Sequence, residues 1–220
     1  MAELITGLDA GLVRERVAEA QERIAQAARR AGREPEAVEL LAAVKYVPLD
    51  ELGTLADAGL RLLGENRAQE LVRKAEAYPG MFTWDFIGHL QSRKVKDVVP
   101  HARLIHSVAS DSVLAQLATR ARSETQVLVE VNVAGEASKS GITPRELPAF
   151  LERAPVPVVG LMTMPPAVAA SEENRPHFAA LRKLAAAHGL RHLSMGTSQD
   201  YEVAVEEGAT IVRLGSTLYR

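Results

Sequence analysis

A single lysine follows a run of five apolar residues, and this lysine is the side chain best suited to attack a carbonyl compound. The run is Leu40-Leu41-Ala42-Ala43-Val44, and Lys45 comes directly after it. Such a run is typical of a strand buried on both faces, as in parallel sheets. A lysine held against apolar walls is desolvated, which favours the nucleophilic free amine. On this segment alone, a lysine extending into solvent is the stronger interpretation.

Two segments near the C-terminus combine small residues with hydroxyl groups, a composition that suits a phosphate group. They are Leu193-Ser194-Met195-Gly196-Thr197-Ser198 and Arg213-Leu214-Gly215-Ser216-Thr217. Ser198 also precedes an expected helix, which it would cap and whose N-terminal amides would favour an anion. From the local sequence alone, ordinary turns explain the glycines and serines better than a phosphate site does.

The elements that must position these residues alternate along the chain. Apolar residues recur at helical spacing from Asp9 to Arg30 and predict an N-terminal amphipathic helix that Gly32 ends. After the strand ending at Lys45, strands are expected over 61–64, 83–88, 104–108, 126–133, 156–164, 192–195 and 210–215. Helices are expected over 48–59, 67–77, 91–99, 111–122, 144–153, 172–188 and 199–207. Ser110, Thr143 and Ser171 are expected N-caps, and Glu146 completes a capping box with Thr143.

Eight strands, each but the last followed by a helix, predict an α/β protein with one domain over 1–220. The expected architecture is a (β/α)8 barrel of the TIM type with an extra N-terminal helix. An open doubly wound sheet is the structural alternative, although no GxGxxG motif follows the first strand. In such barrels chemistry takes place at the carboxyl ends of the strands, often with a phosphate site after strands seven and eight.

Strand alternation predicts which side chains enter the barrel. Lys45 is expected to point inward together with Leu41 and Ala43. The same parity directs Glu130 and Arg213 into the interior, where a charge needs a partner or a ligand. One ion pair between these two residues and a ligand-binding role are equally good interpretations.

Composition excludes several classes of function. The 220 residues include no cysteine, so disulfides and thiolate nucleophiles are excluded. A net charge of −2 gives no attraction for nucleic acid or an anionic membrane. The N-terminal region has no apolar run that suits a signal peptide or a membrane span, so we expect a cytoplasmic protein. No histidine spacing suits a metal site, and no continuous exposed apolar surface is evident, so we expect a metal-free monomer.

Seven or more short motifs, in the right order over nearly the whole chain, resemble those of the pyridoxal phosphate homeostasis protein family. This family is similar to the N-terminal domain of alanine racemase and binds pyridoxal 5′-phosphate (PLP). The motifs are Ala43-Val44-Lys45, Leu63-Gly64-Glu65-Asn66, Phe86-Ile87-Gly88-His89-Leu90-Gln91-Ser92, Val131-Asn132-Val133, Ser138-Lys139-Ser140-Gly141, Gly160-Leu161-Met162, Leu193-Ser194-Met195-Gly196 and Val212-Arg213-Leu214-Gly215. No single motif is specific, but the set is.

The resemblance implies a role for each residue of the site. Lys45 would form the internal aldimine with PLP, Arg213 would face the pyridine nitrogen, and Asn66 would lie near the ring substituents. For the phosphate, the resemblance implies binding by Ser198, Gly215 and Ser216, with Ser194 and Gly196 shaping the loop. The family has threonine where this chain has Ser216, a difference that keeps the hydroxyl group.

The resemblance also implies a carrier of PLP with little or no catalysis. A guanidinium group cannot accept a proton and disfavours a positive charge on the neighbouring pyridine nitrogen, so the ring would stay largely unprotonated and be a poor electron sink. The length of the chain also leaves no room for the second domain of alanine racemase, which supplies an opposing base.

Two alternatives remain open. One is a racemase-like PLP enzyme that uses Lys45 as its base, and the other is a barrel enzyme that acts on a phosphorylated metabolite without a cofactor. PLP-dependent apoenzymes are the expected recipients of the cofactor, and Lys139 is a candidate second amine for its transfer. His89 could line the mouth of the barrel, although a structural histidine is at least as good an interpretation.

Overall fold

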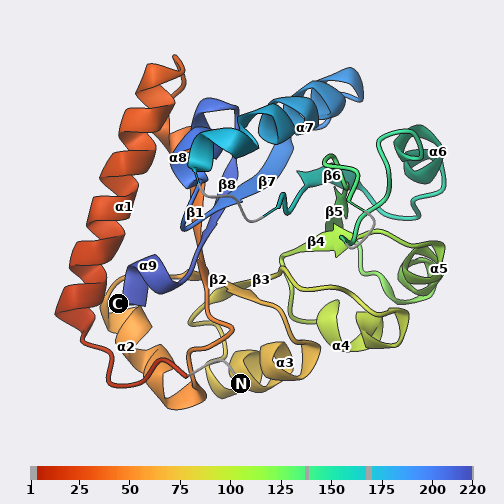
Figure 1. The fold of residues 1–220 in the computed structure, drawn as a ribbon. Helices are drawn as coiled ribbons and strands as arrows, with labels where there is room; N and C mark the ends of the chain where they lie inside the picture. Colours follow the sequence, from red (N-terminus) through yellow and green to blue (C-terminus); the bar gives the residue numbers. More distant parts are fainter. Residues whose placement is uncertain (1–3, 137–138, 167–169, 220) are drawn as a thin grey trace.

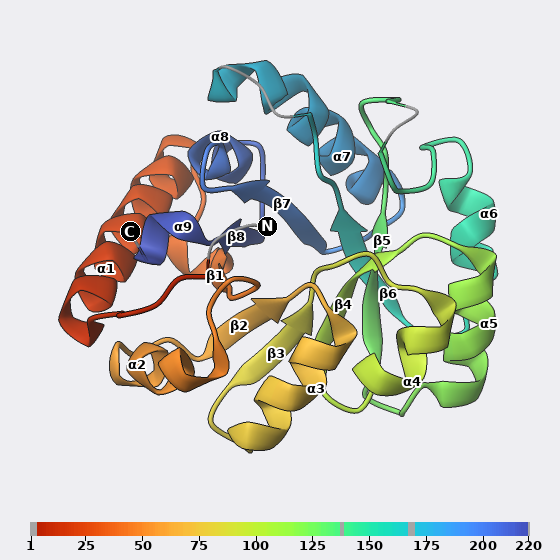
Figure 2. The ribbon, with the colours of Figure 1, turned by 60° about the horizontal axis from the view of Figure 1, so that its bottom comes forward.

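Eight parallel strands form a closed barrel in the order of the sequence, which confirms the predicted TIM-type fold and excludes an open sheet (Figure 2). The computed structural model describes residues 4–136, 139–166 and 170–219. The strands are β1 (Glu39–Ala43), β2 (Leu62–Glu65), β3 (Thr83–Phe86), β4 (Leu104–Val108), β5 (Gln126–Glu130), β6 (Val158–Met162), β7 (His192–Thr197) and β8 (Ile211–Leu214). The barrel closes where β1 pairs with β8, with Leu41 opposite Arg213.

Helices surround the barrel, and the long N-terminal helix completes this ring between α8 and α2, with α9 beside it (Figures 1 and 2). The helices are α1 (Ala10–Arg30), α2 (Leu52–Asp57), α3 (Ala68–Ala77), α4 (Val95–Val98), α5 (Asp111–Arg120), α6 (Leu147–Glu152), α7 (Arg175–Ala187), α8 (Tyr201–Glu206) and α9 (Ser216–Tyr219). Short 3-10 turns, η1 to η4, are Pro35–Ala37, Leu49–Glu51, Ser92–Lys94 and Ser171–Asn174. The additional N-terminal helix expected from the sequence is therefore confirmed.

Local sequence explains both ends of α1. The carboxylate of Asp9 accepts a hydrogen bond from the Leu12 amide at 2.8 Å and so caps the first turn. Gly32 follows the helix with a φ of +66°, a conformation that glycine adopts without strain. Between these ends, Ala20, Ile24 and their helical neighbours are buried against α8 and the barrel.

The other predicted caps have different outcomes. Ser110 caps α5, because its Oγ accepts a hydrogen bond from the Val113 amide at 3.3 Å. Thr143 does not cap α6, which begins later at Leu147; its amide and hydroxyl instead donate to the Glu146 carboxylate. Ser171 is the first residue of η4 rather than its N-cap. The prediction of a cap is therefore wrong for Thr143 and Ser171.

Several strands are shorter than predicted. The first strand ends at Ala43, and the Val47 amide then donates to the Val44 carbonyl at 3.1 Å. Lys45 therefore lies in a turn beyond the strand. Strand β5 ends at Glu130, because beyond it Val131 forms only an isolated bridge.

The parity predicted for the barrel interior is confirmed. A cluster of five buried apolar residues fills part of the interior: Leu41, Leu104, Leu128, Met162 and Ile211. Ala42 and Val44 belong to the larger cluster between the strands and the helices. Full burial of each large aliphatic side chain contributes about 1.5–3 kcal/mol to folding.

Gly160 provides a test of the barrel register. It pairs with His192 across β6 and β7, and a Cβ atom at position 160 would lie 2.1 Å from the His192 carbonyl oxygen. Since that oxygen belongs to the backbone, Gly160→Ala should lower the free energy of unfolding by at least about 1–3 kcal/mol in urea titrations. Gly53→Ala in α2 is the control, because only Tyr78 Oη lies near, at 3.9 Å. Equal stability of the two variants would contradict the register.

Candidate functional site

A cavity of about 670 Å³ opens at the carboxyl ends of the strands. Its walls come from the segments that follow β1, β2, β3, β7 and β8, together with parts of the N-terminal segment and of the loop after β6. The lining residues are Ile5, Ala43, Lys45, Tyr46, Asn66, Ile87, Gly88, Met164, Thr197, Ser198, Gln199, Arg213, Gly215 and Ser216. This mouth cavity lies at the end of the barrel that the sequence predicted.

Six of the eight predicted site residues line the mouth cavity. They are Lys45, Asn66, Ser198, Arg213, Gly215 and Ser216. The other two, Ser194 and Gly196, are buried below it in β7. The structure therefore brings together residues from opposite ends of the chain, as the barrel interpretation required.

Lys45 is more exposed than the sequence suggested. The residue lies in the turn after β1, and its Nζ is 4.9 Å from the centre of the Tyr46 ring. The expectation that apolar walls desolvate this amine is wrong, because the apolar strand ends before Lys45. Its amine instead projects from a fixed turn, where it is accessible to a ligand.

A buried ion pair fixes the turn that carries Lys45. Nζ of Lys74, a residue that is only 1% exposed, donates to the Val44 carbonyl at 2.8 Å and to Glu65 Oε1 at 2.5 Å. The other carboxylate oxygen of Glu65 accepts a hydrogen bond from the Asn66 amide at 2.8 Å. This pair joins the residue before Lys45 to the residue before Asn66. Lys74 was not predicted as a site residue, because the sequence places it at an otherwise ordinary position in α3.

Arg213 projects from β8 into the buried base of the cavity. Its Nη1 donates to the carbonyl oxygen and to the Oγ of Ser194 at 2.8 and 2.5 Å, and its Nη2 donates to the Thr163 carbonyl at 2.9 Å. Burial lowers the pKa of Arg213 to about 10, against the opposing effect of Asp200 and Glu130. The guanidinium group therefore remains protonated at neutral pH.

Glu130 and Arg213 do not form an ion pair with each other. Such a pair was one of the two interpretations of their inward-facing positions. The Glu130 carboxylate accepts a hydrogen bond from Ser140 Oγ at 2.5 Å. Among the ion pairs of the described residues, none joins Glu130 to Arg213. Arg213 therefore acts on the cavity as a cation held by neutral acceptors.

A chain of buried polar side chains continues below Arg213. Ser194 Oγ lies 2.8 Å from His106 Nδ1, and His106 Nε2 lies 3.1 Å from Asp85 Oδ2. Asp85 also accepts two hydrogen bonds from Arg103, at 2.9 and 2.7 Å. Asp85 and His106 were not predicted as site residues, although each is a polar residue in an expected strand and Asp85 stands between two apolar neighbours.

The local environment lowers the pKa values of both His106 and Asp85. Burial lowers the pKa of His106, and the nearby Asp85 only partly opposes this effect. Burial raises the pKa of Asp85, but hydrogen bonds from His106 and Arg103 outweigh it, so the net shift is downward. Asp85 is therefore ionised and His106 is neutral at pH 7.

The loops after β7 and β8 are joined at the cavity wall. The Gly215 amide donates to Ser198 Oγ at 3.3 Å. Ser198 does not cap α8, contrary to the prediction, because Asp200 occupies the position before that helix and its carboxylate accepts a hydrogen bond from the Thr197 amide at 2.7 Å. The side chain of Ser198 faces the other loop instead.

The two predicted glycines have different structural roles. Gly196 has a φ of +90°, and a Cβ atom there would lie 2.6 Å from the Ala204 side chain, so glycine is required for β7 to meet α8. At Gly215 a Cβ atom would meet only Ala43, at an ordinary 3.6 Å from its carbonyl oxygen. Packing among the described residues therefore does not require glycine at position 215, which is consistent with a space kept for a ligand.

Asn66 presents an unused hydrogen-bond acceptor. Its Oδ1 atom is buried and has no hydrogen-bond partner in the described part of the chain, while the residue lines the mouth cavity. A buried acceptor without a partner is unfavourable unless a ligand or water donates to it.

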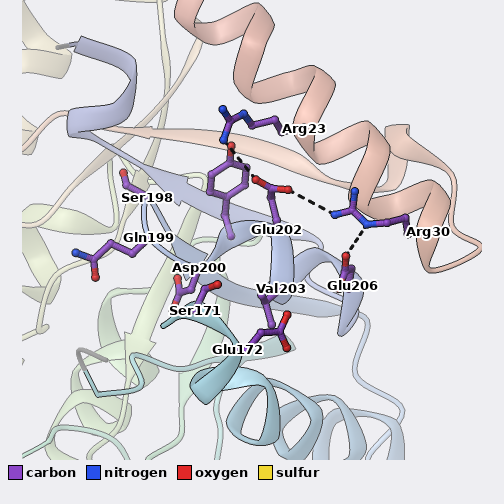
Figure 3. A pocket seen from close by; sticks show the side chains of 11 residues that line it. Arg23, Arg30, Ser171, Glu172, Ser198, Gln199, Asp200, Glu202, Val203 and Glu206 are labelled. Atoms are coloured by element: carbon purple, nitrogen blue, oxygen red, sulfur yellow. Dashed lines mark hydrogen bonds and ion pairs between the residues drawn. The ribbon is translucent and has the colours of Figure 1, made fainter. Parts of the chain in front are cut away.

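A second, smaller cavity of about 290 Å³ lies between α1 and α8 (Figure 3). Both of its arginines are paired with carboxylates: Arg30 Nε lies 2.7 Å from Glu206, and Arg23 Nη1 lies 3.6 Å from Glu202. Because these arginines already have carboxylate partners, this cavity offers less to an anionic ligand than the mouth cavity does.

Two secondary candidates from the sequence do not line the mouth cavity. Lys139 and His89 are both exposed, and neither belongs to its walls. Ser138, in the motif that contains Lys139, lies outside the described residues. A transfer role for Lys139 therefore stays a prediction.

The fold and the cavity define a (β/α)8 barrel protein whose mouth cavity is lined by the cationic residues Lys45 and Arg213. Residues 16–220 match the family model described as the N-terminal domain of alanine racemase. The chain is 42% identical to the pyridoxal phosphate homeostasis protein of Aquifex aeolicus, over 93% of this chain and 96% of that protein. The chain therefore belongs to the pyridoxal phosphate homeostasis protein family.

Solved structures agree with this assignment. The structure of PipY from Synechococcus elongatus without PLP superposes with a TM-score of 0.81 at 32% identity, over 94% of this chain and all of that one. The structure of PipY with PLP bound gives a TM-score of 0.78 at 29% identity, with the same coverage.

The buried pair of Lys74 and Glu65 can be tested with a double-mutant cycle. Lys74→Met should lower the free energy of unfolding by about 3–5 kcal/mol, because it leaves the Glu65 carboxylate buried without a counter-charge. Glu65→Gln in the Lys74→Met background should recover part of this loss, since it removes the uncompensated charge. Strictly additive effects in urea titrations would contradict a direct coupling of the two side chains.

Proposed function

We propose that this protein binds PLP in the mouth cavity and maintains cellular PLP levels, with little or no catalysis of its own. The observation that carries the proposal is the convergence of one amine, one guanidinium group and two hydroxyl-bearing loops on a single cavity. Membership of the family and the PLP-bound structure of PipY support it. When bound, PLP supplies an aldehyde that condenses with an amine and a ring that can withdraw electrons.

The residues of the cavity fit the groups of PLP. Lys45 would hold the aldehyde carbon covalently, with loss of one water molecule, and its exposed position leaves the amine free to react. Ser198, Gly215 and Ser216 would hold the phosphate, for which the open space at Gly215 leaves room. The positive charge of Arg213 favours an anionic ligand in the same cavity.

The ring of PLP would contact the remaining polar groups. Asn66 Oδ1, the buried acceptor without a partner, would accept a hydrogen bond from a donor on the ring. Arg213 would face the pyridine nitrogen as a donor. Since a protonated guanidinium group has no acceptor site and carries a positive charge, Arg213 would disfavour a proton on that nitrogen.

The lining supports a carrier better than a racemase. Its described residues include no carboxylate or histidine that could serve as an opposing base. Tyr46 is the remaining titratable side chain beside Lys45 and Arg213, but its ring lies next to Lys45 on the same turn. An active racemase needs proton donors on both faces of its substrate. Lys45 and Tyr46 lie on the same turn and would supply donors on one face only.

The accessibility of the site supports release of the cofactor to other proteins. Lys45 lies in an exposed turn, so water or a second amine can approach the carbon that it would hold. We propose PLP-dependent apoenzymes as the recipients and a monomer as the working form. Among the described residues, no helix is long and apolar enough to cross a membrane.

Two variants separate the covalent contact from the phosphate contact. Lys45→Ala should abolish covalent attachment of PLP but leave weak reversible binding, because the phosphate loops remain. Gly215→Ala should fold with a free energy of unfolding within about 1 kcal/mol of the wild type, yet lose the preference for PLP over unphosphorylated pyridoxal. Absorbance spectra and equilibrium dialysis measure both. If Gly215→Ala keeps the full preference for PLP, the phosphate site is elsewhere.

Exchange of the substrate α-hydrogen decides between carrier and racemase. The PLP-loaded protein, incubated with a panel of amino acids in deuterated water, should exchange the α-hydrogen no faster than free PLP does, because an opposing base is lacking. Proton NMR of the amino acids gives the rate, and chiral chromatography gives the stereochemistry. Rapid exchange with inversion, lost in Lys45→Ala, would establish the racemase alternative.

A further inference from the structure

The guanidinium group of Arg213 has little freedom to turn. Of its five N–H donors, those on Nη1 meet the carbonyl oxygen and the Oγ of Ser194, and those on Nη2 meet the Thr163 carbonyl oxygen and Met164 Sδ. The donor on Nε has no hydrogen-bond partner among the described residues. Arg213 lines the mouth cavity, so this donor is the one that remains for a ligand.

The acceptor at Ser194 depends on where its own proton goes. A serine hydroxyl has one hydrogen to donate and two lone pairs to accept. Since Arg213 Nη1 donates to Ser194 Oγ, the hydroxyl hydrogen must point elsewhere, and the nearest acceptor is His106 Nδ1 at 2.8 Å. This arrangement requires that Nδ1 carry no proton.

Asp85 sets the proton position on His106. Its Oδ2 lies 3.1 Å from His106 Nε2, and a carboxylate can only accept a hydrogen bond. Nε2 must therefore carry the proton and Nδ1 the lone pair. Arg103, which donates to both oxygens of Asp85, keeps this carboxylate ionised and fixed. The hydrogen bonds then run in one direction, from Arg213 through Ser194 and His106 to Asp85.

We propose that Asp85, His106 and Ser194 are positioning residues that hold Arg213 with its Nη atoms turned into the barrel and its Nε donor turned toward the ligand. All three side chains are fully buried, and none of them lines the mouth cavity, so they act on a ligand through Arg213. The effect on bound PLP rests on the proposed function, whereas the proton arrangement does not.

The first test uses the wild-type protein without PLP. Side-chain ¹⁵N NMR at pH 7.5 distinguishes the protonated nitrogen of each histidine ring from the unprotonated one, and His106→Gln assigns the signal. We expect a neutral His106 ring with the proton on Nε2. A proton on Nδ1, or on both nitrogens, would overturn the proposal, whether or not the protein binds PLP.

The second test interrupts the series of hydrogen bonds from Arg213 to Asp85 at two residues. Ser194→Ala removes the link to His106, and Asp85→Asn replaces the acceptor with an amide that donates to Nε2 and so moves the ring proton to Nδ1. Each variant should weaken PLP binding about tenfold, the effect of losing one hydrogen bond to a charged group. Each should also shift the pH titration of the PLP absorbance band. In Asp85→Asn, NMR should report the proton on Nδ1.

A control and a rescue separate positioning from stability. Thr125→Val removes a buried hydroxyl just before β5, where Thr125 Oγ1 accepts a hydrogen bond from the Arg122 amide at 2.9 Å. It should lower stability without changing PLP affinity or the titration. Ser194→Thr keeps the hydroxyl group, so its PLP affinity and its titration of the PLP band should be closer to wild type than those of Ser194→Ala. If the Ser194→Ala and Asp85→Asn proteins fold and keep wild-type PLP affinity and the wild-type titration of the PLP band, the hydrogen bonds from Arg213 to Asp85 have only a structural role.

Discussion

The pairing of β1 with β8 is the interaction on which the site depends. These strands come from opposite ends of the chain, and their parallel ladder places Leu41 opposite Arg213 and Ala42 opposite Leu214. Lys45 follows one strand and Gly215 follows the other, so closure of the barrel brings the amine and the phosphate loop to one cavity. An open sheet would leave them on separate edges. The function proposed here is therefore a consequence of the closed barrel.

Buried charge is arranged differently at the two sides of the cavity. Below the turn of Lys45, Lys74 and Glu65 neutralise each other and fix two backbone segments. Below the ligand side, Arg213 is surrounded by carbonyl and hydroxyl acceptors, and the Asp85 carboxylate is separated from it by Ser194 and His106. The first arrangement removes net charge from the core, whereas the second leaves a positive charge available to an anion.

The sequence predicted the parts of the structure that local patterns encode. The apolar pattern identified the eight strands, and parity along single strands predicted the inward direction of Leu41 and Arg213. Small residues with hydroxyl groups identified the loops after β7 and β8. Parity along one strand is a property of that strand alone, so it can be derived without knowing its neighbours.

Contacts between distant segments could not be derived in this way. The partners of Asp85 and His106 come from other strands, and the register between strands is not encoded in any one of them. The environment of Lys45 was predicted incorrectly because β1 ends at Ala43, two residues before the strand end expected from the sequence. Ser198 was expected to cap α8, but the helix begins later, at Tyr201, so Asp200 stands at the position before it.

The central claim is that the amine of Lys45 is the point at which this barrel holds PLP. The most direct measurement is peptide mass spectrometry of the protein after incubation with PLP and reduction with borohydride. The account predicts one phosphopyridoxyl group per chain, on the peptide that contains Lys45. Modification spread over the other lysines, or no modification above that of a heat-denatured sample, would contradict it.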